Sequence, residues 1–364
     1  MIKIMKYQFE DYLVHRITSE FLPNKKVVSV EPIYTGHINK TFRIVTDAPE
    51  ETREYLLQNL NTHVFTKPDA VMHNIVRCAN FLHTECPEYP YEILTPIASV
   101  GDGSYLIQDD GLAWRMFEYV SDSKSQDVVS TADEAHKIGE AFGVFLSFVN
   151  RDSTEYYKVT IPDFHDFTRR YHNFHLFLKD YGEVKDERCK YLIAEIERNA
   201  TDYLEMETLK FPLRIIHHDT KVNNVLLDRQ SGHVKCIIDL DTLMPGYIFS
   251  DLGDLMRTLL NPYDEDNFPE NGKIMDDKVV SSLLDGFLNP IDQMLTNDEK
   301  EYLIQGAKKI TLLQILRFLE DHLKGDIYYQ VKYTGHNLDR ALSQLNLYHG
   351  MNNCELLNTP IVNN

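Results

Sequence analysis

The chain has 364 residues, of which 43% are apolar and 26% are charged, a composition typical of folded globular proteins. Its 56 acidic residues outnumber its 37 basic residues, and the net charge of -19 argues against a general affinity for nucleic acid or anionic membranes. The length favours about two domains.

The N-terminal stretch MIKIMKYQFEDYLVHRI lacks an apolar run of signal-peptide length, and no later segment is apolar enough to cross a bilayer. The five cysteines are scattered and form no Cys-x-x-Cys pair, which is typical of reduced thiols. We therefore expect a cytoplasmic protein without nucleic-acid or membrane partners. Its number of subunits does not follow from the sequence.

The first third of the chain is rich in predicted strands. Short β-rich runs at 26–34, 41–45 and 54–60 precede a helical pattern over 70–82, and strand patterns follow at 104–108 and 113–120. These elements predict a small β-rich lobe over residues 1–120.

Helical patterns dominate after the polar connector 121–131, over 132–149, 171–181 and 185–206. A later helix is predicted to begin at a capping box, Thr296 to Glu299, in which each side chain satisfies a free backbone donor of the other. Its inward-facing stripe recurs at spacings of three and four residues: Leu303, Ala307, Ile310, Gln314 and Arg317. We expect a larger, mainly helical lobe over residues 121–364.

One polar segment, IIHHDTKVNNVLL at 215–227, is flanked by apolar strand-like ends, so its polar residues are held rigidly. The following sequence, NVLLD-RQSG-HVKCIIDLD, predicts a β-hairpin. Antiparallel pairing would place Asn224 opposite a position between Ile237 and Asp239. The hairpin would therefore bring two oxygen ligands to one place.

Asp219, Asn224 and Asp239 fit the requirements of phosphoryl transfer. Mg²⁺ prefers hard oxygen ligands, which Asn224 and Asp239 can supply, while Asp219 can accept the proton of an attacking hydroxyl. Asp241 competes with Asp239 for the metal, because a strand period of two would put both on one face. We favour Asp239.

The segment from His217 to Asn224, together with Ile238 and Asp239, resembles the aminoglycoside phosphotransferase and choline kinase superfamily of small-molecule kinases. Within it, TGHINKTF, HHDTKVNN, IIDLDTLMPG and RFLEDHLKGDIYYQVKY resemble the N-acetylhexosamine 1-kinases, over about 27–347. The resemblance implies an α+β, bilobal protein-kinase-like fold with a small β-rich N-lobe and a larger, mainly helical C-lobe. It also implies ATP and Mg²⁺ as cofactors and transfer of phosphate to the anomeric hydroxyl of an N-acetylhexosamine.

The resemblance also implies roles for individual residues. Asp219 is then the catalytic base, and Asn224 and Asp239 bind the metal. The remaining implied residues face either the sugar (His37, Arg317 and Tyr328) or the nucleotide (Gly36, Asn39, Glu118, Tyr119 and Val120). Asp251 matches an aspartate that supports the catalytic loop in these kinases, although it would equally well cap the following helix.

Two features depart from the kinase pattern. The loop YTGHINKTF has one glycine, Gly36, where protein kinases have three. The third strand carries Gln58 where a kinase places the lysine that pairs with the phosphates, so the sequence assigns no charged phosphate anchor.

Other interpretations of these residues stay open. His217, His218 and Asp219 could form a zinc cluster, although adjacent strand residues point to opposite faces. Arg317 could make a core salt bridge, and His37 could be an exposed loop histidine. The alternative functions are a kinase of the same fold acting on choline, homoserine or an aminoglycoside, and a catalytically silent sugar- or nucleotide-binding protein.

Overall fold

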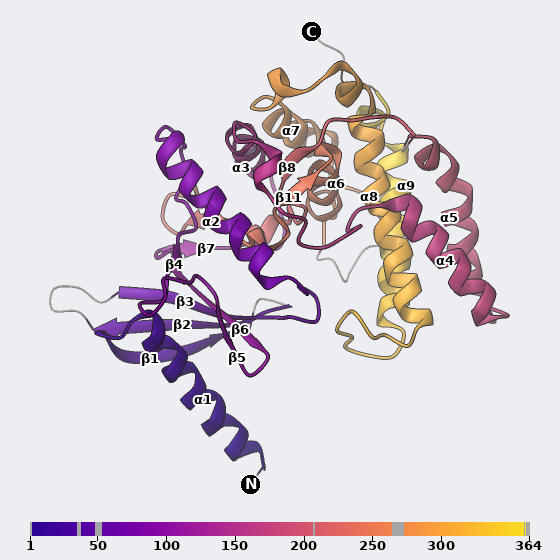
Figure 1. Ribbon diagram of the computed structural model, residues 1–364. Helices are drawn as coiled ribbons and strands as arrows, with labels where there is room; N and C mark the ends of the chain where they lie inside the picture. Colours follow the sequence, from indigo (N-terminus) through magenta and orange to yellow (C-terminus); the bar gives the residue numbers. More distant parts are fainter. Residues whose placement is uncertain are drawn as a thin grey trace. The chain divides into compact units, whose positions relative to one another are not determined.

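The computed structural model describes residues 2–34, 38–47, 53–206, 208–263, 273–359 and 361, with side chains from residue 12 onward (Figure 1). The chain forms two compact units. Unit 1 consists of Met1–Ser123, Glu155–Ile161 and Leu240–Leu243, and unit 2 consists of Lys124–Thr154, Pro162–Asp239 and Met244–Asn364.

Unit 1 is built on an antiparallel sheet with the strand order β1-β2-β3-β6-β4, in which β5 also pairs with β6. The elements of its first segment are α1 (Ile2–Phe21), β1 (Lys26–Ile33), β2 (Lys40–Asp47), β3 (Arg53–Leu60), α2 (Pro68–Glu85), β4 (Pro96–Ile97), β5 (Ile107–Asp109), β6 (Leu112–Glu118) and the start of β7 (Ser123–Lys124). The three strands predicted at 26–60 are all present, whereas the strand predicted at 104–108 begins only at Ile107.

One face of the sheet packs against α1, a helix that is not among the predicted elements. The cluster between them is formed by buried residues of the helix and the strands, among them Val14, Ile17, Ile44, Leu57 and Met116. Alternate residues of β2 and β3 enter this core because side chains of a strand point to opposite faces in turn. Burial of such apolar side chains is the main stabilising contribution to a sheet and helix pair.

Unit 2 is mainly helical. Its elements are α3 (Ala132–Val149), α4 (Phe167–Tyr181), α5 (Glu187–Met206), β8 (Arg214–Ile216), β9 (Val225–Asp228), β10 (Val234–Ile237), β11 (Met244–Gly246), α6 (Ile248–Leu259), α7 (Asp277–Leu288), α8 (Asn297–Leu323) and α9 (His336–Asn353). One hydrophobic core joins α4, α5, α8 and α9, and it includes Phe174, Ile196, Leu316 and Leu345. The chain is therefore an α+β protein.

The long helix α8 is buried along most of its length, and α6 and α9 pack against it (Figure 1). Glycine allows α6 to approach closely: a Cβ at Gly253 would lie 2.5 Å from the carbonyl oxygen of Ala307. The predicted capping box is confirmed, because the Thr296 side chain accepts from the N–H of Glu299 and the Glu299 carboxylate accepts from the N–H of Thr296.

Membrane-spanning helices and disulfides are both absent from the part of the chain that the structure describes. None of its helices is long and apolar enough to traverse a bilayer. All five cysteines are buried thiols, and no disulfide forms among them.

Candidate active site

The polar segment 217–224 of unit 2 connects the end of β8 to the start of β9. β8 pairs with β11 in antiparallel register, Ile216 opposite Met244. The His218 ring packs on this ribbon, where a Cβ at Gly246 would lie only 2.5 Å from its Nε2 atom. His218 itself has φ +66°, a strained conformation for a residue other than glycine.

Asp251 on α6 holds the first residues of this segment in place. Its buried carboxylate accepts from the backbone N–H of His217 at 2.8 Å and from that of His218 at 2.7 Å, and its carbonyl oxygen accepts from the Thr220 hydroxyl at 2.6 Å. Burial raises the pKa of Asp251 to about 7, against the lowering effect of the two N–H donors. The N-cap of α6 is Tyr247, so the supporting role of Asp251 is the one that the structure shows.

His217 is buried as a neutral ring with a defined tautomer. Its Nδ1 accepts from the N–H of Asp219 at 3.2 Å, so the ring proton is on Nε2, which donates to the carbonyl oxygen of Ile238 at 3.0 Å. Burial lowers the pKa of His217, although the nearby Asp219 carboxylate partly opposes this effect. His217 thereby joins the loop to the end of the β9–β10 hairpin.

The Asp219 carboxylate lies between the side chains of Lys221 and Asn224. Burial alone would raise its pKa, but the Lys221 ammonium, 3.0 Å from Oδ1, opposes burial, and the pKa of Asp219 is lowered. The other oxygen, Oδ2, accepts from Nδ2 of Asn224 at 3.1 Å. A carboxylate kept ionised in this way can accept a proton.

Asn224 and Asp239 lie on neighbouring ends of the predicted hairpin. The N–H of Ile238 donates to the carbonyl oxygen of Asn224 at 2.9 Å, and Val225 pairs with Ile237, so the predicted register is confirmed. Because Nδ2 of Asn224 donates to the carbonyl and carboxylate oxygens of Asp219, its Oδ1 is directed elsewhere. Asp239 follows with an exposed side chain and φ +62°.

Asp241 does not share a strand face with Asp239, so that prediction is wrong. β10 ends at Ile237, and the chain continues as a 3-10 helix, Leu240–Thr242, which belongs to unit 1. There the Asp241 carboxylate is 2% exposed and pairs with both Nη atoms of Arg115, at 2.5 and 2.9 Å. The strand period of two does not apply once the strand has ended.

Arg115 in unit 1 is a residue that the sequence patterns did not identify as part of a site. It is 2% exposed on β6, directly opposite Gln58 of β3, and its Nε donates to Gln58 Oε1 at 3.0 Å. Gln58 in turn donates to the Thr41 hydroxyl at 3.1 Å. The signal in the sequence was a single arginine inside the apolar strand AWRMF, because a buried arginine requires a partner.

The predicted nucleotide-binding residues lie in unit 1. Asn39 donates to Asp241 at 2.8 Å and accepts from the N–H of Asn61 at 3.0 Å, so its side chain is engaged within the protein. The N–H groups of Glu118 and Tyr119 donate to backbone carbonyls at 3.0 and 3.2 Å, whereas no carbonyl among the described residues accepts from the N–H of Val120. Gly36 and His37 lie outside the described residues.

Arg317 on α8 lies in unit 2 among aromatic rings. Its guanidinium carbon is 5.1 Å from the ring centre of Phe164, 5.8 Å from that of Tyr328 and 5.6 Å from that of Tyr329. Its hydrogen bond goes to Gln314 Oε1 at 3.3 Å. Within the described part of the chain Arg317 makes no ion pair, so the core salt bridge considered for it is not observed.

Tyr328 is carried by a loop that one carboxylate fastens to the end of α8. Asp321 is 6% exposed and accepts from the backbone N–H groups of Ile327, Tyr328 and Tyr329 at 2.8 to 3.0 Å. The Asn337 side chain donates to the same carboxylate at 2.9 Å. Half-exposed Tyr328 is therefore fixed beside Arg317.

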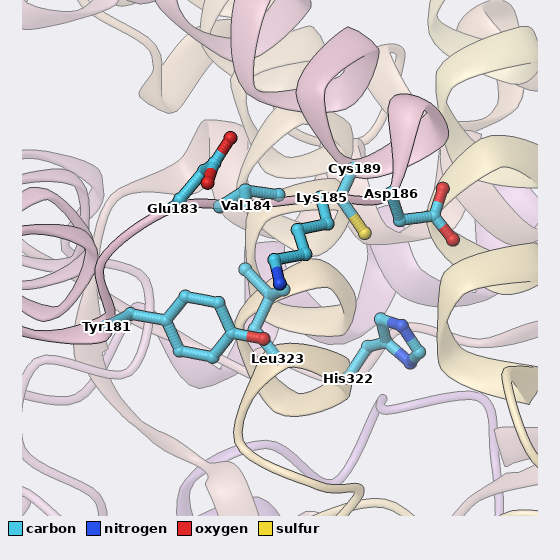
Figure 2. Close-up of a pocket in the computed structure, with 8 residues that line it drawn as sticks. All are labelled: Tyr181, Glu183, Val184, Lys185, Asp186, Cys189, His322 and Leu323. Carbon is cyan, nitrogen blue, oxygen red and sulfur yellow. The ribbon is translucent and has the colours of Figure 1, made fainter.

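A cavity in unit 2 lies apart from the predicted residues. It has a volume of about 350 Å³ and is lined by Tyr181, Glu183, Val184, Lys185, Asp186, Cys189, His322 and Leu323 (Figure 2). Figure 2 shows Lys185 extending across it toward Leu323, and burial raises the pKa of the Cys189 thiol. Within the described ranges, no three histidine, cysteine or acidic residues come together as a potential metal site. The zinc cluster considered for His217, His218 and Asp219 is therefore not observed among these residues.

The chain is similar to known phosphotransferases. The Phosphotransferase enzyme family matches residues 29–271, more than half of the chain. Among solved structures, an aminoglycoside phosphotransferase from Alicyclobacillus acidocaldarius is 13% identical, with a TM-score of 0.59, and the match covers 88% of this chain and 90% of that one.

Two further structures extend the comparison. The streptomycin–ATP ternary complex of APH(2")-IIa is 13% identical, has a TM-score of 0.55, and is matched over 92% of this chain and 96% of that one. A choline kinase from Cryptosporidium parvum is 14% identical, has a TM-score of 0.53, and is matched over 88% of both chains. These likenesses confirm the protein-kinase-like fold, with an antiparallel sheet in one unit and a helical majority.

Proposed function

Because the chain belongs to the phosphotransferase enzyme family, we propose that it is an ATP-dependent kinase that phosphorylates the anomeric hydroxyl of an N-acetylhexosamine. The observation that carries the proposal is the set of interactions around Asp219, in which an ionised carboxylate is held beside Asn224 at one end of the hairpin that leads to Asp239. ATP as the donor is supported by the ternary complex of the similar aminoglycoside phosphotransferase.

In the proposed reaction the Asp219 carboxylate accepts the proton of the sugar hydroxyl as its oxygen attacks the γ-phosphorus. The bond between that phosphorus and the β,γ-bridging oxygen breaks, so the products are the sugar 1-phosphate, ADP and a proton held by Asp219. Lys221 supports this role because its ammonium lowers the pKa of Asp219 and keeps the carboxylate ionised before the reaction. Asp251 fixes the backbone of the preceding residues and so orients the base.

The residues present fit a magnesium site. Asn224 Oδ1 is directed away from Asp219 by the two bonds of its Nδ2 atom, and the Asp239 side chain is exposed. Amide and carboxylate oxygens are ligands that Mg²⁺ accepts when it also binds substrate phosphates. When bound, the metal would neutralise charge on the phosphates, and Asn224 and Asp239 would hold it.

The acceptor side of the proposal rests on Arg317 and Tyr328, with His37 included by family resemblance. Aromatic faces often bind cationic ligands, but here the guanidinium of Arg317 already covers Phe164 and Tyr328. A guanidinium offers several hydrogen-bond donors and no acceptor, which suits the oxygens of a neutral sugar and disfavours an ammonium group. This is the reason for proposing a sugar over choline or an amino alcohol.

For the nucleotide we propose residues 1–120 as the binding lobe and 121–364 as the catalytic and substrate-binding lobe. The N–H of Val120 is the proposed donor to adenine, with Glu118 and Tyr119 alongside, since their own N–H groups already donate to the backbone. Gly36 and Asn39 are proposed to lie near the phosphates.

A screen of ATP consumption tests this proposal. We expect turnover with N-acetylglucosamine or N-acetylgalactosamine, and the product should carry phosphate at C1, as shown by ³¹P and ¹H NMR. Arg317→Met should raise KM for the sugar, whereas Arg169→Met, which removes an exposed arginine paired with Asp163, should not. If no sugar caused ATP consumption, a sugar kinase would be excluded.

A second function is favoured by the net charge of -19, which would attract cationic acceptors such as choline or an aminoglycoside. The same screen separates the two, because a cationic acceptor should be turned over more slowly as ionic strength rises. Turnover of choline or an aminoglycoside alone would replace the sugar with an amine-bearing alcohol and leave the roles of Asp219, Asn224 and Asp239 unchanged.

A further inference from the structure

We infer that Arg115 is a positioning residue for the metal site: its buried ion pair with Asp241 fixes the chain that immediately follows the metal ligand Asp239. The inference rests on the proposed function and deepens it. Arg115 on β6 also lies directly opposite Gln58, so a buried cation is present on the strand next to the position where a kinase places its lysine.

The contact is a buried ion pair in which Nη2 of Arg115 also donates a hydrogen bond to Oδ2 of Asp241. The two Nη atoms of Arg115 lie 2.5 and 2.9 Å from the two carboxylate oxygens of Asp241, and both side chains are at most 3% exposed. The third donor, Nε, bonds to Gln58 at 3.0 Å, which fixes the plane of the guanidinium. Removing one partner would leave a buried charge uncompensated, so this pair strongly favours one position of Asp241.

Other groups of unit 1 hold the same short segment. Asn39 donates to the second oxygen of Asp241 at 2.8 Å. Asn74, fully buried on α2, donates to the carbonyl oxygen of Leu243 at 2.7 Å and is itself held by the backbone of Lys158. The segment Leu240–Leu243 is therefore held by hydrogen bonds at two residues, Asp241 and Leu243.

Asp239 lies between this fastened segment and the hairpin. On its N-terminal side Ile238 is bonded through its N–H to Asn224 and through its carbonyl to His217. On its C-terminal side Asp241 follows after one residue. Asp239 has φ +62°, a left-handed conformation that aspartate adopts more readily than most residues other than glycine. The hydrogen bonds of Ile238 and the ion pair of Asp241 with Arg115 hold the chain on either side of it.

The same geometry distinguishes the two candidate metal ligands. Asp241 uses one oxygen for Arg115 alone and the other for Arg115 and Asn39, whereas Asp239 has an exposed side chain. Arg115 thus acts on the metal through Asp241 and Asp239, as residues behind the direct ligands generally do.

Mn²⁺ binding in the presence of ADP, followed by electron paramagnetic resonance, tests the inference without requiring turnover. Arg115→Met and Asp241→Asn should each weaken Mn²⁺ binding by about 10- to 100-fold. The double variant should be no weaker than the worse single variant, because both changes remove the same interaction. In turnover the concentration of Mg²⁺ at half-maximal rate should rise, while KM for the acceptor stays unchanged.

The matched control is Arg16→Met, which removes an arginine of unit 1 that pairs with Asp109 at a partly exposed site. It should bind Mn²⁺ within about twofold of the wild type, because such pairs contribute little. Folding of unit 1 is followed by the fluorescence of Trp114, the only tryptophan of the chain. If Arg115→Met does not fold, Arg115→Lys provides the test instead. Lysine keeps the positive charge but cannot contact both carboxylate oxygens of Asp241 as the guanidinium does, so Mn²⁺ binding should still weaken.

Two results would overturn the inference alone: folded Arg115 variants that bind Mn²⁺ as tightly as Arg16→Met, or weakening by Asp241→Asn without weakening by Arg115→Met, which would make Asp241 a direct ligand. A wild-type protein that neither binds Mn²⁺ with ADP nor consumes ATP would instead refute the proposed function itself.

Discussion

The ion pair between Arg214 and Glu299 anchors strand β8, which leads into the polar segment 217–224, and its removal should be costly. Nε and Nη2 of Arg214 donate to the two carboxylate oxygens of Glu299 at 3.1 and 2.8 Å, and the Glu299 side chain is 1% exposed. Arg214→Met would leave this buried carboxylate without its cation, which should cost about 3–5 kcal/mol of unfolding free energy. Urea unfolding followed by far-UV circular dichroism measures the loss.

The control is a pair of the same geometry at the surface. Arg188 donates through Nε and Nη2 to the two oxygens of Asp186 at 3.4 and 3.1 Å, but the side chains are 55% and 40% exposed. Water can replace that contact, so Arg188→Met should cost only about 0–1 kcal/mol. Equal losses in the two variants would refute the argument that burial sets the cost.

A second substitution separates two contributions to the lost stability: the lost ion pair and the buried charge of Glu299 that remains without a partner. Adding Glu299→Gln to Arg214→Met removes the buried charge while the amide oxygen can still accept from the N–H of Thr296, as in the capping box. The double variant should therefore be more stable than Arg214→Met alone. If the two losses simply add, the buried charge is not the cause.

Three further changes test the site and the electrostatics of unit 2. Asp219→Asn should lower turnover by about 10²- to 10⁴-fold while the far-UV circular dichroism stays native, and an unchanged rate would remove Asp219 from the mechanism. Asn224→Ala should raise the Mg²⁺ concentration at half-maximal rate by about tenfold, equivalent to a contact of about 1.4 kcal/mol; a variant indifferent to Mg²⁺ concentration would exclude the ligand role. Burial lowers the pKa of Lys308 from 10.5 to about 8, so between these values the unfolded chain binds more protons than the folded one and stability rises with pH. Lys308→Met, at a position 6% exposed, should raise stability at pH 7 by up to about 3 kcal/mol and abolish that rise, which urea unfolding at pH 7 and pH 10 will measure.

Local patterns in the sequence predicted several elements correctly. The capping box at Thr296 and Glu299 depends on backbone groups three residues apart, and the β9–β10 hairpin depends on one short turn, so both are encoded by neighbouring residues. The hairpin register followed from this turn and placed Asn224 beside Ile238. The fold class followed from several family motifs in the same order, and the solved structures confirm it.

Other features were not accessible to such patterns. The strand period predicted Asp241 beside Asp239, but the strand ends at Ile237, and Asp241 pairs with Arg115, 126 residues away in the sequence. Helix α1 was not predicted either: its buried residues, among them Val14 and Ile17, pack on a sheet whose strands come later in the chain.

The sequence by itself determined the groups that we propose for phosphoryl transfer, because Asp219, Asn224 and Asp239 follow one another within a loop and a hairpin whose geometry is local. The tertiary structure alone decided which carboxylate each cation meets and which carboxylate supports the loop: Arg115 meets Asp241, and Asp251 binds the N–H groups of His217 and His218. Buried charges and backbone donors must find partners, and those partners come from distant segments that only the packed core brings within hydrogen-bonding distance.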